Sequence, residues 1–339
     1  MRITYVLPRP ELGGGNKVVF QHAALLAERG EEVTLLGEGP KPTWIASPLP
    51  YLDISAGLPR LPEQDLVIAT FWTTLALARQ LGAGPVAHFC QGYEGGLVHL
   101  HPLLPEIEAA YSLPLPAITV SPHLQEFLHT RFGRESTVVP PPLDPAFRPR
   151  LRLFPRRRPW IVIPGIFEAE VKGIPLALQA VRQLRASGLA CRVLRLSVLP
   201  LSTAEARLLA PDRFLCLVPP AEVARELPRA DLLFFPSRPA EGFGLPLLEA
   251  MASGVPAVAS RIPSTVDMIA GYEAAIPLVA PDDPTAFAAA ARELLHPANW
   301  RRARRAESQA VRRFRPEIVG ERLAAAVRWA RERALQTAG

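Results

Sequence analysis

The stretch from Glu241 to Ala252 constrains the fold of this chain more than any other. It reads Glu-Gly-Phe-Gly-Leu-Pro-Leu-Leu-Glu-Ala-Met-Ala and follows an apolar run, Leu232 to Phe235, that is typical of a buried parallel strand. Its two glycines indicate a loop, and Pro246 stands where a helix tolerates proline best, at its first position. The stretch therefore predicts a strand, a glycine-containing loop and a helix, which is the repeating unit of an α/β sheet.

A loop of this kind suits a phosphate or a sugar hydroxyl. It presents unpaired backbone N–H groups and the positive end of a helix dipole at the carboxyl end of a parallel strand. Glu241 lies in the loop and Glu249 one turn into the helix, so the two carboxylates can face opposite ends of one extended, hydroxyl-rich ligand. The alternative is an ordinary α/β loop in which Glu249 is a solvated acid favoured by the dipole.

The whole stretch, with two glutamates separated by seven residues, resembles the donor-site signature of family four glycosyltransferases. The resemblance implies an α/β protein of the GT-B fold, with two Rossmann-like domains facing across a cleft. It also implies that Glu241 contacts the transferred sugar and Glu249 the ribose of a nucleotide-diphosphate sugar. The donor would lie along Gly242, Phe243, Gly244 and Leu245, and the transfer would retain the anomeric configuration.

Length and proline content divide the chain. With 339 residues it is long enough for two α/β domains of ordinary size. Proline density and loss of periodicity after Val139, through about residue 159, indicate a linker. We expect an acceptor domain over residues 1–150 and a donor domain over 151–315. The resemblance implies that the last helix, in residues 316–339, crosses back to the first domain. Residues 40–64 are rich in proline and are expected to be irregular.

The first domain opens with a strand, a glycine-rich loop over 13–17 and a helix from Val18 to Arg29. Gly14 and Gly15 are candidates for bringing backbone N–H groups to a phosphate, and Asn16 is a candidate on the acceptor side. A dinucleotide fingerprint would need a third glycine where Val18 stands. We therefore discount NAD binding.

A second polar loop, Gln91 to Gly96, follows the apolar run that ends at Cys90. Gln91 and Glu94 are candidates for the acceptor and sugar side, because α/β sites gather at the carboxyl ends of strands. Many members of the resembled family have a histidine where Gln91 stands. Glutamine keeps the hydrogen bonding but cannot act as a general acid or base. His88, within the strand, is expected to be a core histidine.

Lys172 is the cation expected at the diphosphate. The resembled family usually has both an arginine and a lysine gripping this group, and Lys172 matches the lysine. The arginine position reads Ile166, which removes one expected positive charge, and Arg238 is a candidate substitute. We expect Glu241 and Lys172 to be the catalytic residues. The alternative for Lys172 is an ordinary surface lysine.

The charge of the chain is unevenly placed. Residues 1–150 carry 11 Lys and Arg against 14 Asp and Glu, net −3, whereas the rest carries 27 against 18, net +9. A basic second half suits a nucleotide diphosphate and would also suit an anionic membrane surface, at which we expect peripheral contact. The arginine clusters lack the interleaved aromatics or zinc spacing of nucleic-acid modules, so no nucleic-acid partner is expected. The absence of a signal peptide or a long apolar stretch predicts a cytoplasmic protein. The membrane contact that the basic second half would suit is then at the inner membrane face.

No cofactor is expected beyond the donor itself. The sequence has no Asp-x-Asp motif and no His/Cys cluster, which predicts metal-independent transfer. The three cysteines are expected in the core. The base (UDP or GDP) and the acceptor (carbohydrate, lipid-linked or small molecule) stay open. Two other functions also stay open: a non-catalytic nucleotide-sugar-binding subunit of a transferase complex, and a nucleotide-sugar 2-epimerase.

Overall fold

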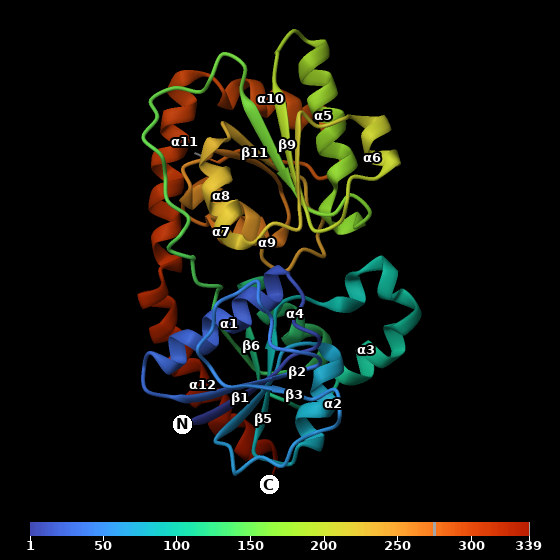
Figure 1. The fold of residues 1–339 in the computed structure, drawn as a ribbon, viewed down its shortest axis with the longest axis vertical. Coiled ribbons are helices and arrows are strands. Elements are labelled where there is room, and N and C mark those ends of the chain that lie inside the picture. Colours follow the sequence, from blue (N-terminus) through green and yellow to red (C-terminus); the bar gives the residue numbers. More distant parts are fainter. Residues whose placement is uncertain (274–275, 339) are drawn as a thin grey trace. The chain divides into compact units, whose positions relative to one another are not determined.

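The computed structural model describes residues 1–273 and 276–338, which divide into two compact units. Unit 1 consists of residues 1–142 together with the C-terminal segment from Pro316, and unit 2 of residues 143–315 (Figure 1). Each unit is built on one sheet of parallel strands with helices, which confirms the predicted α/β class. No helix in the described ranges has the length and apolar character needed to cross a bilayer.

Unit 1 has a seven-stranded sheet in the order β3-β2-β1-β4-β5-β6-β7. Its strands are β1 (Arg2–Val6), β2 (Glu32–Gly37), β3 (Tyr51–Asp53), β4 (Leu66–Ala69), β5 (Val86–Cys90), β6 (Ala117–Thr119) and β7 (Ser136–Val138). Its helices are α1 (Gly14–Ala27), α2 (Trp72–Gln80), α3 (Leu104–Tyr111), α4 (Pro122–Phe132) and α12 (Pro316–Ala338), with 3-10 turns η1 (Glu94–Gly96) and η2 (Val98–Leu103).

The last helix, α12, packs within unit 1, against α1 and against β4, β5 and β6. Its buried residues Val319, Leu323, Val327 and Ala330 recur at helical spacing and are all fully enclosed. The two units divide at residues 142/143, eight residues before the predicted boundary. Leu143 already belongs to unit 2, where its N–H donates to the carbonyl of Phe314 at 2.6 Å.

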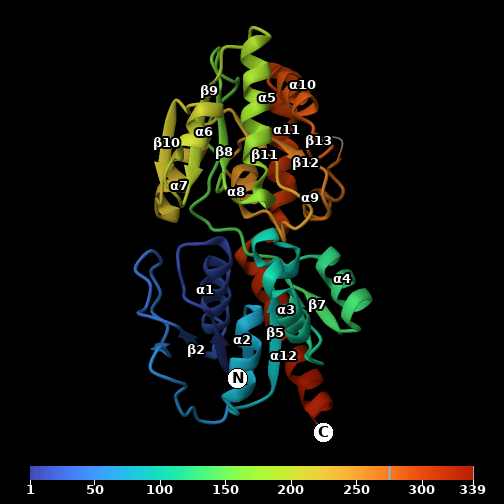
Figure 2. The same cartoon turned by 90° about the vertical axis from the view of Figure 1, so that its right-hand side faces the viewer.

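Unit 2 has a six-stranded sheet in the order β10-β9-β8-β11-β12-β13. Its strands are β8 (Trp160–Pro164), β9 (Arg192–Ser197), β10 (Arg213–Cys216), β11 (Leu232–Phe235), β12 (Ala257–Ser260) and β13 (Leu278–Val279). Its helices are α5 (Ile174–Ala186), α6 (Thr203–Leu208), α7 (Pro220–Glu226), α8 (Leu245–Ala252), α9 (Pro263–Ile269), α10 (Pro284–Leu294) and α11 (Pro297–Ala310), with η3 (Glu170–Lys172), η4 (Leu227–Arg229) and η6 (Val311–Phe314). Helices α5 and α10 pack side by side and share one apolar core with the strands (Figure 2).

Three local expectations were wrong. The proline-rich residues 40–64 contain β3, which pairs with β2 because Leu35 N–H donates to Pro50 and Ile54 N–H to Gly37. Helix α1 begins at Gly14, so the glycines form its first turn instead of a preceding loop. Cys216 is exposed, because β10 is the edge strand of its sheet, whereas Cys90 and Cys191 are buried as expected.

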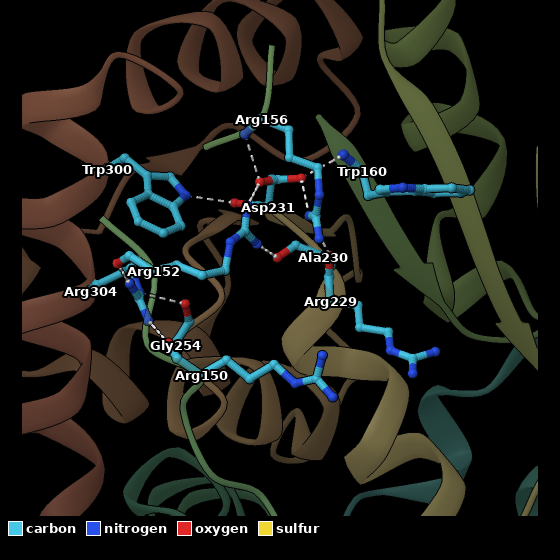
Figure 3. Close-up of polar contacts among 10 residues, drawn as sticks. All are labelled: Arg150, Arg152, Arg156, Trp160, Arg229, Ala230, Asp231, Gly254, Trp300 and Arg304. Atoms are coloured by element: carbon cyan, nitrogen blue, oxygen red, sulfur yellow. Dashed lines mark hydrogen bonds and ion pairs between the residues drawn. The ribbon is translucent and has the colours of Figure 1, made fainter. Parts of the chain in front are cut away.

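One buried carboxylate secures the start of β11. Asp231 is fully enclosed and accepts hydrogen bonds from the backbone N–H of Arg156 at 3.0 Å and of Trp160 at 2.9 Å. It also pairs with the guanidinium groups of Arg152 and Arg156, while its own carbonyl accepts from the indole of Trp300 (Figure 3). A buried charge is tolerated only with such partners. Asp231 therefore ties the segment that enters unit 2 to the core of its sheet.

We expect Asp231→Asn to destabilise unit 2 by about 3 kcal/mol, because it leaves two arginines without their buried partner. It should also speed cleavage by trypsin within residues 148–158, since the segment loses its attachment. Urea unfolding and timed proteolysis measure both effects. The matched control is Asp283→Asn at the start of α10, where asparagine caps a helix as well as aspartate does. Equal sensitivity of the two variants would contradict the assignment.

Candidate functional site

The site predicted from the sequence lies where the order of strands in unit 2 reverses. From β8 the chain adds β9 and β10 on one side, then returns to β11 on the other side of β8. Strands β8 and β11 are therefore parallel neighbours although about 70 residues separate them, with Leu232 opposite Ile161. Loops that leave the carboxyl ends of two such strands diverge to opposite faces and leave a crevice, which is the usual ligand site of open α/β sheets.

The two loops at this point are joined by the two residues predicted to be catalytic. Lys172 ends the turn η3 after β8, and Glu241 lies in the loop after β11. Their side chains form an ion pair, with Lys172 Nζ 2.7 Å from Glu241 Oε2. A backbone hydrogen bond of 2.8 Å from Arg238 N–H to the carbonyl of Val171 runs beside it. The structure thus brings together two residues that the sequence could only name separately.

Ser237 is a site residue that the sequence analysis missed. Its hydroxyl donates to Glu241 Oε2 at 3.0 Å, and the residue is 1% exposed. The carboxylate of Glu241 therefore has both a cation and a hydroxyl on the same oxygen, which fixes its orientation. The sequence feature that could have identified Ser237 is its position directly after Pro236, at the end of the apolar strand.

Two glycines let the loops come this close. Gly173 has φ +58, and a Cβ on it would lie 2.1 Å from the carbonyl oxygen of Pro236. Gly165, at φ +128, would place a Cβ 3.2 Å from Cβ of Lys172. Only glycine meets both the backbone conformation and the lack of space. The approach of the two loops therefore depends on residues without side chains.

The loop that begins α8 has the predicted form, except that the side chain of Phe243 packs in the core. Gly244 caps the helix at φ +97, and a Cβ there would lie 3.0 Å from the ring of Phe235. Phe243 is 8% exposed and packs its ring 5.7 Å from that of Phe314, so its side chain belongs to the core. Gly242 and Leu245 are half-buried on either side of these two residues, and Glu249 is half-buried on α8 itself.

Arg238, the candidate substitute for the missing family arginine, is bound by two carboxylates. Its guanidinium pairs with Glu170 and with Asp282, the latter at 2.9 Å. Its charge is thus balanced within the loops. Ile166, where the resembled family has arginine, is half-buried.

A second feature that the sequence analysis missed is the buried pair of Arg195 and Glu205. Arg195 lies on β9, is fully enclosed, and pairs through Nε with Glu205. Its other nitrogens donate to the carbonyls of Ile163 and, at 2.8 Å, of Gly165. Burial lowers the pKa of Arg195. The pair therefore holds the beginning of the loop that leads to Lys172. The sequence feature that could have identified it is a charged residue inside an otherwise apolar strand.

In unit 1 the structure brings Gly15 and Gln91 together. A Cβ on Gly15 would lie 3.4 Å from the side-chain amide of Gln91. Gly14 is the first residue of α1, which begins without a side-chain cap. Asn16 is bound to its own loop, since its amide donates to the carbonyls of Glu11 at 2.8 Å and Arg9 at 3.4 Å.

Glu94 faces inward, to the hydroxyl of Tyr111, and only 9% of it is exposed. That hydroxyl also lies 2.7 Å from the carbonyl of Gly92, which can only accept a hydrogen bond. Tyr111 has one proton to donate, so both contacts are hydrogen bonds when Glu94 is protonated and donates to the tyrosine oxygen. Burial accordingly raises the pKa of Glu94 to about 7.

His88 is a core histidine, as predicted. It is 1% exposed, its ring meets that of Tyr111 edge to face, and Arg134 Nη1 lies 3.3 Å from its Nδ1. Burial, followed by the charge of Arg134, sets the pKa of His88 well below its ordinary value. Within the described residues, no group of three or more His, Cys, Asp or Glu side chains is placed to hold a metal ion.

One comparison with known families finds a match within unit 2. Residues 158–297 match a family model described as glycosyl transferases group 1. The match is confined to these residues, which lie within unit 2. The matched range includes both loops of the site, with Lys172, Ser237, Glu241 and Glu249. A comparison with curated protein sequences finds no match to the chain.

Solved structures extend the likeness beyond the matched residues to the whole fold. Sucrose-phosphate synthase from Thermosynechococcus elongatus aligns with a TM-score of 0.78 at 19% identity, covering 100% of both chains. HepE from Anabaena, in complex with UDP and glucose, aligns at 0.74 with 15% identity over 97% of this chain and 100% of that one. WaaG, a glycosyltransferase involved in lipopolysaccharide biosynthesis, aligns at 0.67 with 15% identity over 94% and 98%. The chain therefore has the GT-B fold.

Gly173 provides the first test of the site. We expect Gly173→Ala to weaken nucleotide binding by at least about tenfold, because the added Cβ would push the loop of Lys172 away from that of Glu241. The matched control is Gly188→Ala, which has φ +87 but nothing within 4 Å of its Cβ. The control should cost only about 1–2 kcal/mol of stability and leave binding intact. Nucleotide titration and thermal unfolding of both variants decide between these outcomes.

Glu94 provides a test through pH. Its raised pKa stabilises the folded state fully below the ordinary value of 4.5, and this contribution is lost as the pH rises toward 7. We expect unit 1 to lose up to about 3 kcal/mol over this range relative to Glu94→Gln, which is always neutral. Hydrogen exchange of the β5 amides across pH measures the difference. The exposed Glu106→Gln is the control, and an equal pH profile in all three proteins would contradict the buried neutral carboxyl.

Proposed function

We propose that this chain is a glycosyltransferase that moves a sugar from a nucleotide-diphosphate donor to a hydroxyl acceptor, with retention and without a metal ion. The observation that carries the proposal is the ion pair of Lys172 and Glu241 at the point where the strand order reverses, among the residues that match the group 1 glycosyl transferases model. A cation for phosphate and a carboxylate for hydroxyl groups stand side by side there.

The chemistry of transfer needs both groups. The bond between the anomeric carbon and the phosphate oxygen breaks, its electron pair goes to the departing diphosphate, and positive charge develops on the sugar. Lys172 and the N-terminus of α8 would stabilise the leaving group, since fixed positive charge is most effective where negative charge develops. The acceptor oxygen then bonds to the same face of the anomeric carbon, and its proton passes to the departing phosphate oxygen.

Glu241 would hold the sugar from the opposite side of the pair. Its carboxylate is oriented by Ser237, so it can accept hydrogen bonds from sugar hydroxyls without first being ordered. Glu249 would bind the ribose from its position on α8, as the family resemblance implies. When the donor binds, Lys172 would interact with both Glu241 and the diphosphate. The contacts of Lys172 would therefore differ between the free and the donor-bound protein.

UDP-sugars are the first donors to test. HepE is described in complex with UDP-glucose, and it shares the GT-B fold with this chain at 16% identity. GDP-sugars are the second choice, because the residues that bind the base have no clear sequence pattern and the base is therefore not predicted. Carbohydrate, lipid-linked and small-molecule acceptors all present the required hydroxyl.

A second candidate is a non-catalytic nucleotide-sugar-binding subunit. Two observations favour it: Ile166 replaces an expected arginine, and Arg238 is already bound by Glu170 and Asp282. Such a subunit would bind a nucleotide sugar without releasing nucleoside diphosphate. Both functions therefore require binding of a nucleotide sugar, but only the transferase releases nucleoside diphosphate.

We expect one nucleotide among UDP, GDP, ADP and TDP to raise the melting temperature of the protein, because a ligand that binds only the folded state stabilises it. Lys172→Ala and Glu249→Ala should each reduce this shift. The matched controls are Lys41→Ala in unit 1 and the exposed Glu293→Ala on α10, which should shift as the wild type does. Unchanged shifts in both site variants would remove the site assignment.

Turnover is measured as release of nucleoside diphosphate from UDP- and GDP-sugars. We expect slow hydrolysis by the wild type even without acceptor, and a loss of about 100-fold or more in Glu241→Gln, which keeps the size of the side chain but not its charge. Ser237→Ala should fall between the two, with Ser237→Thr restoring the rate. Tight binding without any release would favour the non-catalytic subunit.

A further inference from the structure

The segment that enters unit 2 has an unusual composition. Residues 148–158 contain six arginines and no acidic residue, and no Asp or Glu occurs between Asp144 and Glu168. Two of the arginines, Arg152 and Arg156, are bound by the buried Asp231 (Figure 3). The structural role of the segment therefore accounts for only part of its positive charge.

The same segment exposes large apolar side chains. Leu151 is 96% exposed, Leu153 62% and Phe154 54%. Single exposed apolar residues are common on protein surfaces, but three within four positions form a patch. Such a patch costs free energy in water, which its removal from water would recover.

The segment runs along α11, which adds further charge. Arg304 of α11 donates to the carbonyls of Arg150, at 2.8 Å, and of Arg152 (Figure 3). Arg301 of the same helix lies over the ring of Phe154, 5.2 Å from its centre. The only acid of α11, Glu307, is fully buried and accepts from the backbone N–H of Ala257 at 3.1 Å. The exposed side of the helix therefore contributes arginines and no carboxylate.

We define the arginine–leucine surface by its apolar residues and the exposed arginines around them. Its members are Arg150, Leu151, Leu153, Phe154, Arg157, Arg301 and Arg305. The hydrogen bonds to Asp231 and Arg304 hold the backbone behind these side chains, so the patch is attached to the domain at two points.

We propose that the arginine–leucine surface binds the face of an anionic phospholipid bilayer. Guanidinium groups bind phosphate oxygens in pairs of hydrogen bonds, and the negative surface potential attracts each of them. Exposed leucine and phenylalanine side chains can enter the boundary between headgroups and acyl chains. Charge alone would suit nucleic acid as well, but leucines have no role in binding phosphates or stacking on bases, and lipid is the partner that uses both kinds of side chain.

The surface consists of residues outside the donor site, so the proposal stands apart from the proposed function. Phosphate groups of a lipid and free phosphate share the same chemistry with arginine. Vesicles containing phosphatidylglycerol, vesicles of phosphatidylcholine alone and inorganic phosphate as competitor distinguish these sources. DNA provides the comparison with nucleic acid.

The experiment is co-sedimentation of the full chain with these vesicles. One variant removes two apolar residues (Leu151→Ser, Leu153→Ser), and another removes two charges (Arg157→Gln, Arg305→Gln). Matched controls in the same unit are Leu199→Ser with Leu201→Ser, and Arg182→Gln with Arg207→Gln, all at exposed positions. Melting temperatures of all variants show whether each is folded.

We expect the wild type to bind vesicles with phosphatidylglycerol, to bind those of phosphatidylcholine much more weakly, and to lose binding as salt is raised. Each surface variant should bind at least about tenfold more weakly, and both controls should bind as the wild type does. Vesicle binding that survives both surface variants would overturn the proposal. So would binding of DNA in place of vesicles, or loss of binding in the apolar control.

Discussion

The adjacency of β8 and β11 is the constraint on which the site depends. All strands of unit 2 run the same way, so the loops that leave the two central strands begin at one edge of the sheet. The loop after β8 carries a cation and the loop after β11 carries a carboxylate, and their ion pair of 2.7 Å closes the gap between them. With a different order of strands, the loops that carry Lys172 and Glu241 would not begin at neighbouring strands.

Strand β11 lies between the candidate site and the arginine–leucine surface of unit 2. At its amino end, the enclosed Asp231 binds the arginine-rich segment and thereby holds the backbone of the arginine–leucine surface. At its carboxyl end, Ser237 orients the carboxylate of Glu241. Only five residues, Leu232–Phe235 and Pro236, lie between these anchors, and all five are buried. A short, buried strand thus supports both the loop of the candidate site and the backbone of the arginine–leucine surface.

The sequence predicted elements where local pattern and burial agree. The apolar run before Pro236, the glycine at position 244 and the terminal helix appear with nearly the expected bounds. It failed where a three-residue strand pairs at a sheet edge, as in Tyr51–Asp53, because so short a segment has no periodicity to read. The buried pair of Arg195 and Glu205 was missed for a related reason, since a charged residue in a strand carries no sign of its partner.

The sequence by itself determined that this is an α/β chain with a glycine-flanked pair of acids after a buried strand, because backbone preference and hydrophobic pattern act locally. Only the tertiary structure decided that Lys172 meets Glu241 across 69 positions, that Glu94 turns inward to Tyr111, and that Leu151 stays in solvent. These outcomes depend on the order of strands and on which side chains compete for the same enclosed space. Burial and long-range pairing are properties of the packed chain, and no local pattern encodes them.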